Sequence, residues 1–361
     1  MASLARLRLR DRDAIITQEG LIFRIFGYTH PPEGYICDLE YAPANLFQSN
    51  NPKAFRTDGK NIFYKFYEDE AWHFVQKKFS QHMVFHKPLG KKVLGVQTVN
   101  IAEVRKPEQA LKKLVEAQPK DELLKALKKV LEATVTASGL SLENFGVFGS
   151  LLHGFYHPKF SDIDLIVYGR GNLEKIRKTL QELYSDGGLG FSNEFVDDLP
   201  IRGKVWRYKN LTPEEFVWHQ RRKLVYAVFH DEESGRAIKV EFEPVKSWNE
   251  IREDYMEIKK ITWVGWIKAV LRVKDDAETP YMPSVYMVEP IQIVEGPRVG
   301  NLERVVSYLE EFRMQAWRDE TVYVEGNLEK VETVRGNFHQ ITLTYGPRYY
   351  EQVLKVVRTM A

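Results

Sequence analysis

In this 361-residue chain, the clearest sign of a catalytic site is a pair of aspartates separated by one residue. Asp162 and Asp164 lead into the apolar run at residues 165–168, which is typical of a buried strand. On a strand the two carboxylates would point to one face, with Cα atoms roughly 6–7 Å apart. Carboxylates at that distance can share two divalent ions about 3.5–4 Å apart, the arrangement that serves in-line phosphoryl transfer.

A Gly-Ser pair precedes the aspartates. Gly149 and Ser150 follow a predicted buried strand at residues 145–148, and a short helix is expected to begin just after them. Glycine lets the backbone approach a ligand closely, and the first amides of a helix can bind an anion. The Ser150 hydroxyl adds a further donor, so this pair is predicted to hold phosphate groups.

A third acid would complete the charge of a two-metal site, and a downstream hairpin offers two. The hairpin joins residues 224–230 to residues 237–245 through a turn. In its second strand Glu241 and Glu243 alternate with apolar residues, so both glutamates are expected to face one side. Either could be the third ligand, provided that folding brings this strand to the aspartates.

Together these elements resemble a known signature. Gly-Ser, a short helix, Asp-x-Asp on a strand and a later strand acid look like the DNA polymerase beta nucleotidyltransferase superfamily, and SDIDLIV is similar to its core motif. The run VEFEPV resembles the third-acid strand of CCA-adding members, a match that selects Glu241. The resemblance covers residues 121–250 and looks most like archaeal predicted nucleotidyltransferases.

The resemblance implies transfer of a nucleoside monophosphate from an NTP to a hydroxyl, with release of pyrophosphate. Asp162, Asp164 and Glu241 would be the catalytic residues and the ligands of two Mg²⁺ ions, with Mn²⁺ as an alternative. Gly149 and Ser150 would bind the nucleotide.

The sequence departs from the small minimal members at the positions after Gly-Ser. Those members have an arginine there, whereas this chain has Leu151, Leu152 and His153. Neutralising the triphosphate would therefore fall to other cations, and a small-molecule acceptor is disfavoured.

A basic stretch with interleaved aromatics suggests the acceptor. Such a pattern suits a phosphate backbone with stacked bases, although a solvated helix and strand would also explain it. We therefore predict an RNA or DNA end as the acceptor. The alternatives are a small-molecule or protein hydroxyl, and a non-catalytic nucleic-acid-binding protein of the same fold. The candidate nucleic-acid-binding residues are Arg202, Lys204, Trp206, Arg207, Tyr208, Lys209, Arg221 and Arg222.

The surrounding elements must position these residues. Residues 1–106 hold β-like runs broken by turns, with one helix expected at 70–81, and are predicted to form a β-rich domain of unassigned role. Apolar residues then recur at helical spacing, most clearly over 121–139. The predicted nucleotidyltransferase domain extends over 107–255.

The last part of the chain returns to strand-like runs. Residues 256–361 are predicted to form a β-barrel-like domain, for which an OB-fold is one candidate. Within it, the spacing of apolar residues over 302–316 favours a helix. The predicted fold class is α+β, a polymerase-beta-like core of mixed sheet and helices flanked by two β-rich domains.

Composition bounds the class of protein. Hydrophobic residues make up 43% of the chain and charged residues 28%, and the net charge of +2 neither requires nor excludes nucleic acid. No apolar run reaches the length of about 18 residues that a membrane span needs. The N-terminus lacks the apolar region of a secretory signal, and the single Cys37 fits a reducing compartment, so a cytoplasmic protein is expected.

Overall fold

The computed structural model describes residues 7–186, 189–346 and 348–357. The chain divides into two compact units. Unit 1 comprises residues 1–173 and 229–255, and unit 2 comprises residues 174–228 and 256–361. In the described residues, none of the helices has the length and apolar character needed to cross a membrane.

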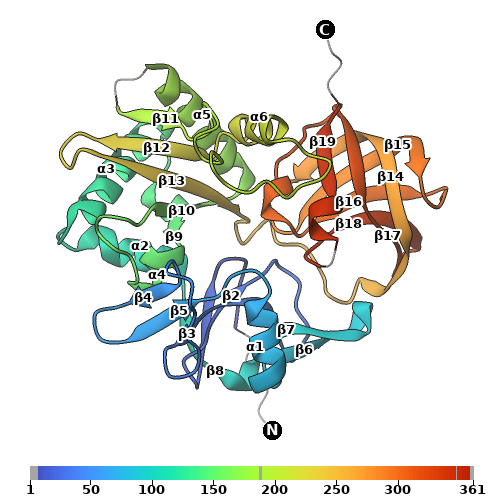
Figure 1. Cartoon of the computed structure of the whole chain (residues 1–361), viewed down its shortest axis with the longest axis horizontal. Coiled ribbons are helices and arrows are strands. Elements are labelled where there is room, and N and C mark those ends of the chain that lie inside the picture. The colour runs from blue at the N-terminus through green and yellow to red at the C-terminus, as the bar shows by residue number, and fades with distance from the viewer. Residues whose placement is uncertain (1–6, 187–188, 347, 358–361) are drawn as a thin grey trace. The chain divides into compact units, whose positions relative to one another are not determined.

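Unit 1 begins with an antiparallel sheet, coloured blue in Figure 1. Its strand order is β4-β5-β3-β2-β1-β8, and β7 pairs with both β3 and β6. The predicted helix at 70–81 is present as α1 and ends at Lys78. The elements are β1 (Ala14–Thr17), β2 (Ile22–Ile25), β3 (Gly34–Pro43), β4 (Phe55–Thr57), β5 (Ile62–Lys65), α1 (Glu70–Lys78), β6 (Met83–His86), β7 (Lys91–Gln97) and β8 (Ile101–Arg105).

The second sheet in chain order is mixed, with the strand order β11-β12-β13-β10-β9. Strand β10 runs parallel to β13 and antiparallel to β9. The predicted hairpin is present as β12 and β13. Its strands and the neighbouring helices are α2 (Pro107–Glu116), α3 (Glu122–Ser138), β9 (Phe145–Val147), α4 (Gly149–His153), β10 (Ile163–Tyr168), α5 (Arg170–Asp186), β11 (Phe191–Asn193), α6 (Pro213–Lys223), β12 (Tyr226–Asp231) and β13 (Arg236–Val245).

Helix α3 has the caps and the apolar spacing from which the sequence predicts a helix. The Asp121 carboxylate caps its first turn by accepting from the Leu124 amide at 3.0 Å. At the other end Gly139 has φ of +65°, the left-handed conformation that ends a helix. Buried residues at helical spacing, among them Leu127 and Val130, form the face that packs inward.

The C-terminal strands of unit 2 close into a ring. The pairing runs β14-β15-β16-β18-β17, and β17 pairs again with β14, while β19 joins β17. Strands β16 and β18 are parallel and the other pairs are antiparallel. An apolar core fills the ring. The strands are β14 (Ile258–Glu278), β15 (Ser284–Glu295), β16 (Leu302–Ser307), β17 (Thr321–Thr333), β18 (Asn337–Leu343) and β19 (Val353–Val356).

The helix expected over 302–316 is wrong. Residues 302–307 form strand β16, and only a 3-10 turn follows at Glu310–Phe312. Val305 pairs with Tyr286 of β15 on one side and with Ile341 of β18 on the other. These pairings, which local spacing does not reveal, decide the conformation.

Candidate active site

The acids singled out from the sequence lie on, or just before, two neighbouring strands of unit 1. Asp164 is in β10, and the parallel register sets it opposite Glu241 in β13. Paired positions on neighbouring strands are roughly 4.8 Å apart and point to the same face. Asp162 comes just before β10, two positions from Asp164, and is exposed. Glu243 pairs with Ile166, two residues further along both strands.

Gly149 lies directly against the carboxylate of Asp164. Its φ is +58°, and a Cβ atom at this position would stand 2.5 Å from the Asp164 Oδ2 atom. Only glycine tolerates both the conformation and the close approach. The neighbouring Phe148 amide donates to the Asp164 carbonyl at 3.1 Å, which fixes the loop against β10.

Ser150 follows in the first turn of α4, a helix that ends at Gly154 with φ of +72°. The Ser150 carbonyl accepts a hydrogen bond from the Phe155 amide at 2.9 Å. The backbone of the Gly-Ser loop is therefore held at both ends, by β10 and by the turn that leaves α4.

Negative charge is concentrated around Asp164. Burial raises the pKa of this carboxyl to about 7, and repulsion by Asp162 is the next cause. Glu243 and Glu40 also raise the pKa, whereas Lys65 lowers it. A partly buried carboxylate among other acids is stabilised by bound cations, so this face of the sheet suits a cationic ligand.

The three acids present the oxygen donors that Mg²⁺ and Mn²⁺ prefer. In the parts of the chain that the structure describes, however, no three His, Cys, Asp or Glu side chains converge closely enough to hold an ion. The donor chemistry of Asp162, Asp164 and Glu241 therefore fits the predicted ions, while their convergence on one ion is not present in this conformation.

Glu243 has a different environment from Glu241. It is 1% exposed and accepts from Arg12 Nε at 2.9 Å, with a second, shorter contact to Arg12 Nη2. Arg12 is itself 3% exposed and has φ of +69°. The pair fastens the N-terminal segment to β13. Sequence reasoning missed this contact, and the alternation of Arg and Asp over residues 10–13 was its only local signal.

His153, one of the residues that replace the expected arginine, is a buried structural imidazole. Arg105 Nη1 lies 3.2 Å from its Nδ1 atom, and the ring packs on Tyr41 and Phe155 at centroid distances of 5.4 and 5.5 Å. Burial, and then the Arg105 charge, lower the pKa of His153 to about 3.

This environment predicts a loss of stability in mild acid. Below pH 6.5 the unfolded chain protonates His153, whereas the folded protein does not until about pH 3. Stability therefore falls as the pH falls, by about 2 kcal/mol between pH 8 and pH 5 from this group. His153→Asn keeps an acceptor for Arg105 and cannot titrate. Denaturant unfolding across this pH range should show a flatter dependence for the variant, and parallel curves would contradict the assignment.

The predicted nucleic-acid-binding stretch lies in unit 2, and its aromatic residues pack on the barrel. Trp206 Nε1 donates to the Leu211 carbonyl at 2.7 Å, and the Tyr208 hydroxyl donates to that of Tyr349 at 2.8 Å. Both rings pack against the apolar core of the barrel. They are therefore structural contacts in this conformation rather than open platforms for bases.

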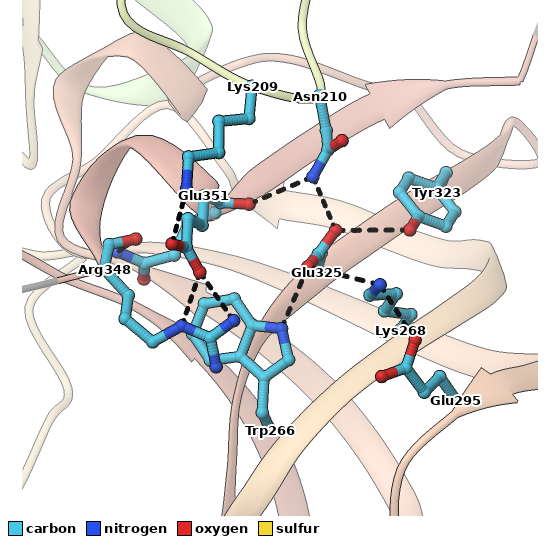
Figure 2. Close-up of polar contacts among 10 residues, drawn as sticks. Lys209, Asn210, Trp266, Lys268, Glu295, Tyr323, Glu325, Arg348 and Glu351 are labelled. Carbon is cyan, nitrogen blue, oxygen red and sulfur yellow. Dashed lines mark hydrogen bonds and ion pairs between the residues drawn. The ribbon is translucent and has the colours of Figure 1, made fainter.

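Most cations of the stretch also contact other residues of unit 2. Figure 2 shows Lys209 paired with Glu351 at 2.8 Å and the neighbouring Asn210 donating to Glu325 at 2.7 Å. Nucleic-acid binding by the stretch stays a prediction. The remaining contacts are Arg202 with Asp198, Arg207 with the Tyr350 hydroxyl (3.2 Å), Arg221 with the Phe195 carbonyl (2.7 Å) and Arg222 with Glu320, while Lys204 is exposed.

A family model matches the segment of the chain that holds these candidate site residues. Residues 127–271 match the family model of the nucleotidyltransferase domain, and this range includes Gly149, Ser150 and all three acids. The chain thus carries a nucleotidyltransferase domain, which confirms the resemblance to the polymerase beta superfamily.

A relative matches over nearly the whole chain. This is the uncharacterized protein MJ1086 of the archaeon Methanocaldococcus jannaschii, 23% identical over 355 residues, which cover 98% of this chain and 100% of the relative. No solved structure matches the chain.

Proposed function

We propose that this protein is a metal-dependent nucleotidyltransferase that joins a nucleoside monophosphate from an NTP to the hydroxyl of a polynucleotide end. The observation that carries this proposal is the pairing of Asp164 with Glu241 on parallel strands, with the Gly149 backbone against the Asp164 carboxylate. Carboxylates and a close-fitting glycine loop on one face suit a metal-bound triphosphate.

Each residue has a defined part in the reaction. Gly149 and Ser150 hold the phosphates through the backbone and the hydroxyl. The acceptor oxygen bonds to the α-phosphorus while the bond from that phosphorus to pyrophosphate breaks, and Glu241 takes the hydroxyl proton. Two Mg²⁺ ions held by Asp162, Asp164 and Glu241 would supply charge neutralisation, which is most of what phosphoryl transfer requires.

A polynucleotide acceptor is supported by the C-terminal barrel. The closed order β14-β15-β16-β18-β17, with β16 and β18 parallel, is compatible with an OB-type barrel, a module that binds oligonucleotides. The packing of Trp206 and Tyr208 into the barrel favours a second candidate, transfer to a small-molecule or protein hydroxyl, because it removes two proposed base-stacking residues.

Incubation with each labelled NTP and Mg²⁺ separates the two candidates. Parallel reactions would contain pooled RNA, pooled DNA or no polynucleotide. We expect label on the 3′ end of RNA or DNA, with equimolar pyrophosphate. Label on a small molecule or on protein would favour the second candidate, and no pyrophosphate under any condition would refute nucleotidyl transfer.

Salt dependence tests the acceptor by a second route. A bound single strand should show log affinity falling with log salt, with a slope of about −0.7 for each phosphate neutralised. Replacing Arg207 and Lys209 together by Ala should flatten this slope by roughly one unit or more. The matched control replaces the exposed Lys175 and Lys178 of α5 and should leave the slope unchanged. Equal slopes in the wild type and both variants would mean that Arg207 and Lys209 do not bind the polynucleotide.

A further inference from the structure

The β4–β5 hairpin of the N-terminal sheet packs on the turn that follows the Gly-Ser loop. The ring of Phe63, in β5, lies 4.7 Å from the ring of Phe155, and Tyr41 of β3 lies 5.3 Å from the same ring. The Phe155 amide in turn donates to the Ser150 carbonyl. In Figure 1 β4 and β5 accordingly lie beside α4. Residues of this hairpin can therefore reach a ligand held by the loop.

Lys65 is on the inward face of this hairpin, together with Arg56, which pairs with Phe63 across it. Lys65 lies two residues after Phe63 on β5, so the two side chains share a face, and it pairs across the sheet with Tyr41. Its amide donates to the Ala54 carbonyl at 2.8 Å, which holds the strand in place. The positive charge of Lys65 lowers the pKa of Asp164. Lys65 also shares a face of the sheet with Tyr41, whose ring contacts Phe155 in the turn after α4.

Two other cations of the sheet, Arg24 and Arg105, have carboxylate partners, and Arg56 of β4 donates to the carbonyls of Lys53 and Phe55 at 2.8 Å. Arg24 lies 3.4 Å from Glu40, and Arg105 lies 2.8 Å from Glu103. Among the described residues Lys65 has no such ion pair; its contact is with the Tyr67 ring, 5.9 Å from the ammonium to the centroid. The Lys65 charge is therefore available to an anionic ligand.

We propose that Lys65 binds the β- and γ-phosphates of the NTP held by Gly149 and Ser150. This inference rests on the proposed nucleotidyl transfer. It supplies the positive charge that the aliphatic residues after Ser150 cannot provide, because a lysine ammonium is well suited to phosphate as a point charge. It also gives the N-terminal sheet a function, since an element outside the matched nucleotidyltransferase region completes the nucleotide site.

Nucleotide binding tests this role separately from turnover. Calorimetry with Mg²⁺ would give the Kd of the full-length protein for each NTP and for the matching NMP. Lys65→Ala should raise the Kd for the bound NTP about 10- to 100-fold, the effect of losing a hydrogen bond to a charged group. The Kd for the NMP should change less than about twofold, because that ligand lacks the two outer phosphates. Lys65→Arg should recover most of the NTP affinity.

The matched control is Lys60→Ala. Lys60 is exposed in the turn between β4 and β5 and has the same charge as Lys65. If Lys65→Ala binds NTP as Lys60→Ala does while the wild type binds and transfers NTP, the inference fails and the proposed function stands. An equal loss of NTP and NMP affinity would mean that Lys65 is structural, which also overturns the inference. A wild type that binds no NTP would overturn both.

Discussion

Asp162→Asn and Asp164→Asn are each expected to reduce nucleotidyl transfer to background while leaving the melting temperature unchanged or higher. Asp164 is partly buried and is repelled by Asp162, Glu243 and Glu40, so its negative charge opposes folding when no cation is bound. An asparagine removes that charge with little change in shape. Turnover with labelled NTP and thermal unfolding of the same preparations would measure both effects.

Asp231→Asn is the matched control, because this carboxylate of β12 is stabilising. It accepts from Lys129 Nζ at 2.6 Å and from the Ser234 hydroxyl at 2.5 Å. Burial opposes ionisation, but these hydrogen bonds hold the pKa of Asp231 below its usual value. The control should therefore melt at a lower temperature with unchanged turnover per folded molecule. If the variants at 162 and 164 instead lost activity only by unfolding, the two aspartates would be structural.

The local parts of the site could be predicted from the sequence. A continuous apolar run identified β10, alternating apolar residues identified β13, and the period of two assigned Asp164 and Glu241 to particular faces. The structure then pairs these two residues across parallel strands. Helix α3, which is capped by Gly139, could also be predicted, because helix caps and apolar periodicity depend on a few neighbouring residues.

Contacts between distant segments could not be predicted in this way. Arg12 and Glu243 are 231 positions apart, and no local pattern indicates that they meet. The charge of Lys65 lowers the pKa of Asp164 only because an N-terminal hairpin packs on the turn after α4. Strand β16 was misread as a helix for the same reason, since its neighbours β15 and β18 come from other parts of the chain.

The two glutamates of β13 are expected to differ in function: Glu241 in catalysis and Glu243 in stability of the fold. Glu241 is partly exposed opposite Asp164, whereas Glu243 is buried against Arg12. A buried ion pair that loses one charge leaves the other uncompensated, which costs about 3–5 kcal/mol when the partner is removed outright. Glutamine retains an acceptor for Arg12, so Glu243→Gln should cost less than this but remain clearly measurable.

Glu241→Gln is therefore expected to lower turnover by orders of magnitude at a nearly constant melting temperature. Glu243→Gln should do the opposite, lowering the melting temperature while turnover per folded molecule falls far less. The reason is that Glu241 stands beside Asp164 on the face proposed to hold the ions, while the Glu243 carboxylate is already occupied by a guanidinium. Turnover assayed well below both melting temperatures, together with thermal unfolding, would separate the two effects. A large loss of turnover in Glu243→Gln alone would move the third catalytic acid two residues along β13 and assign the Arg12 contact to the active site.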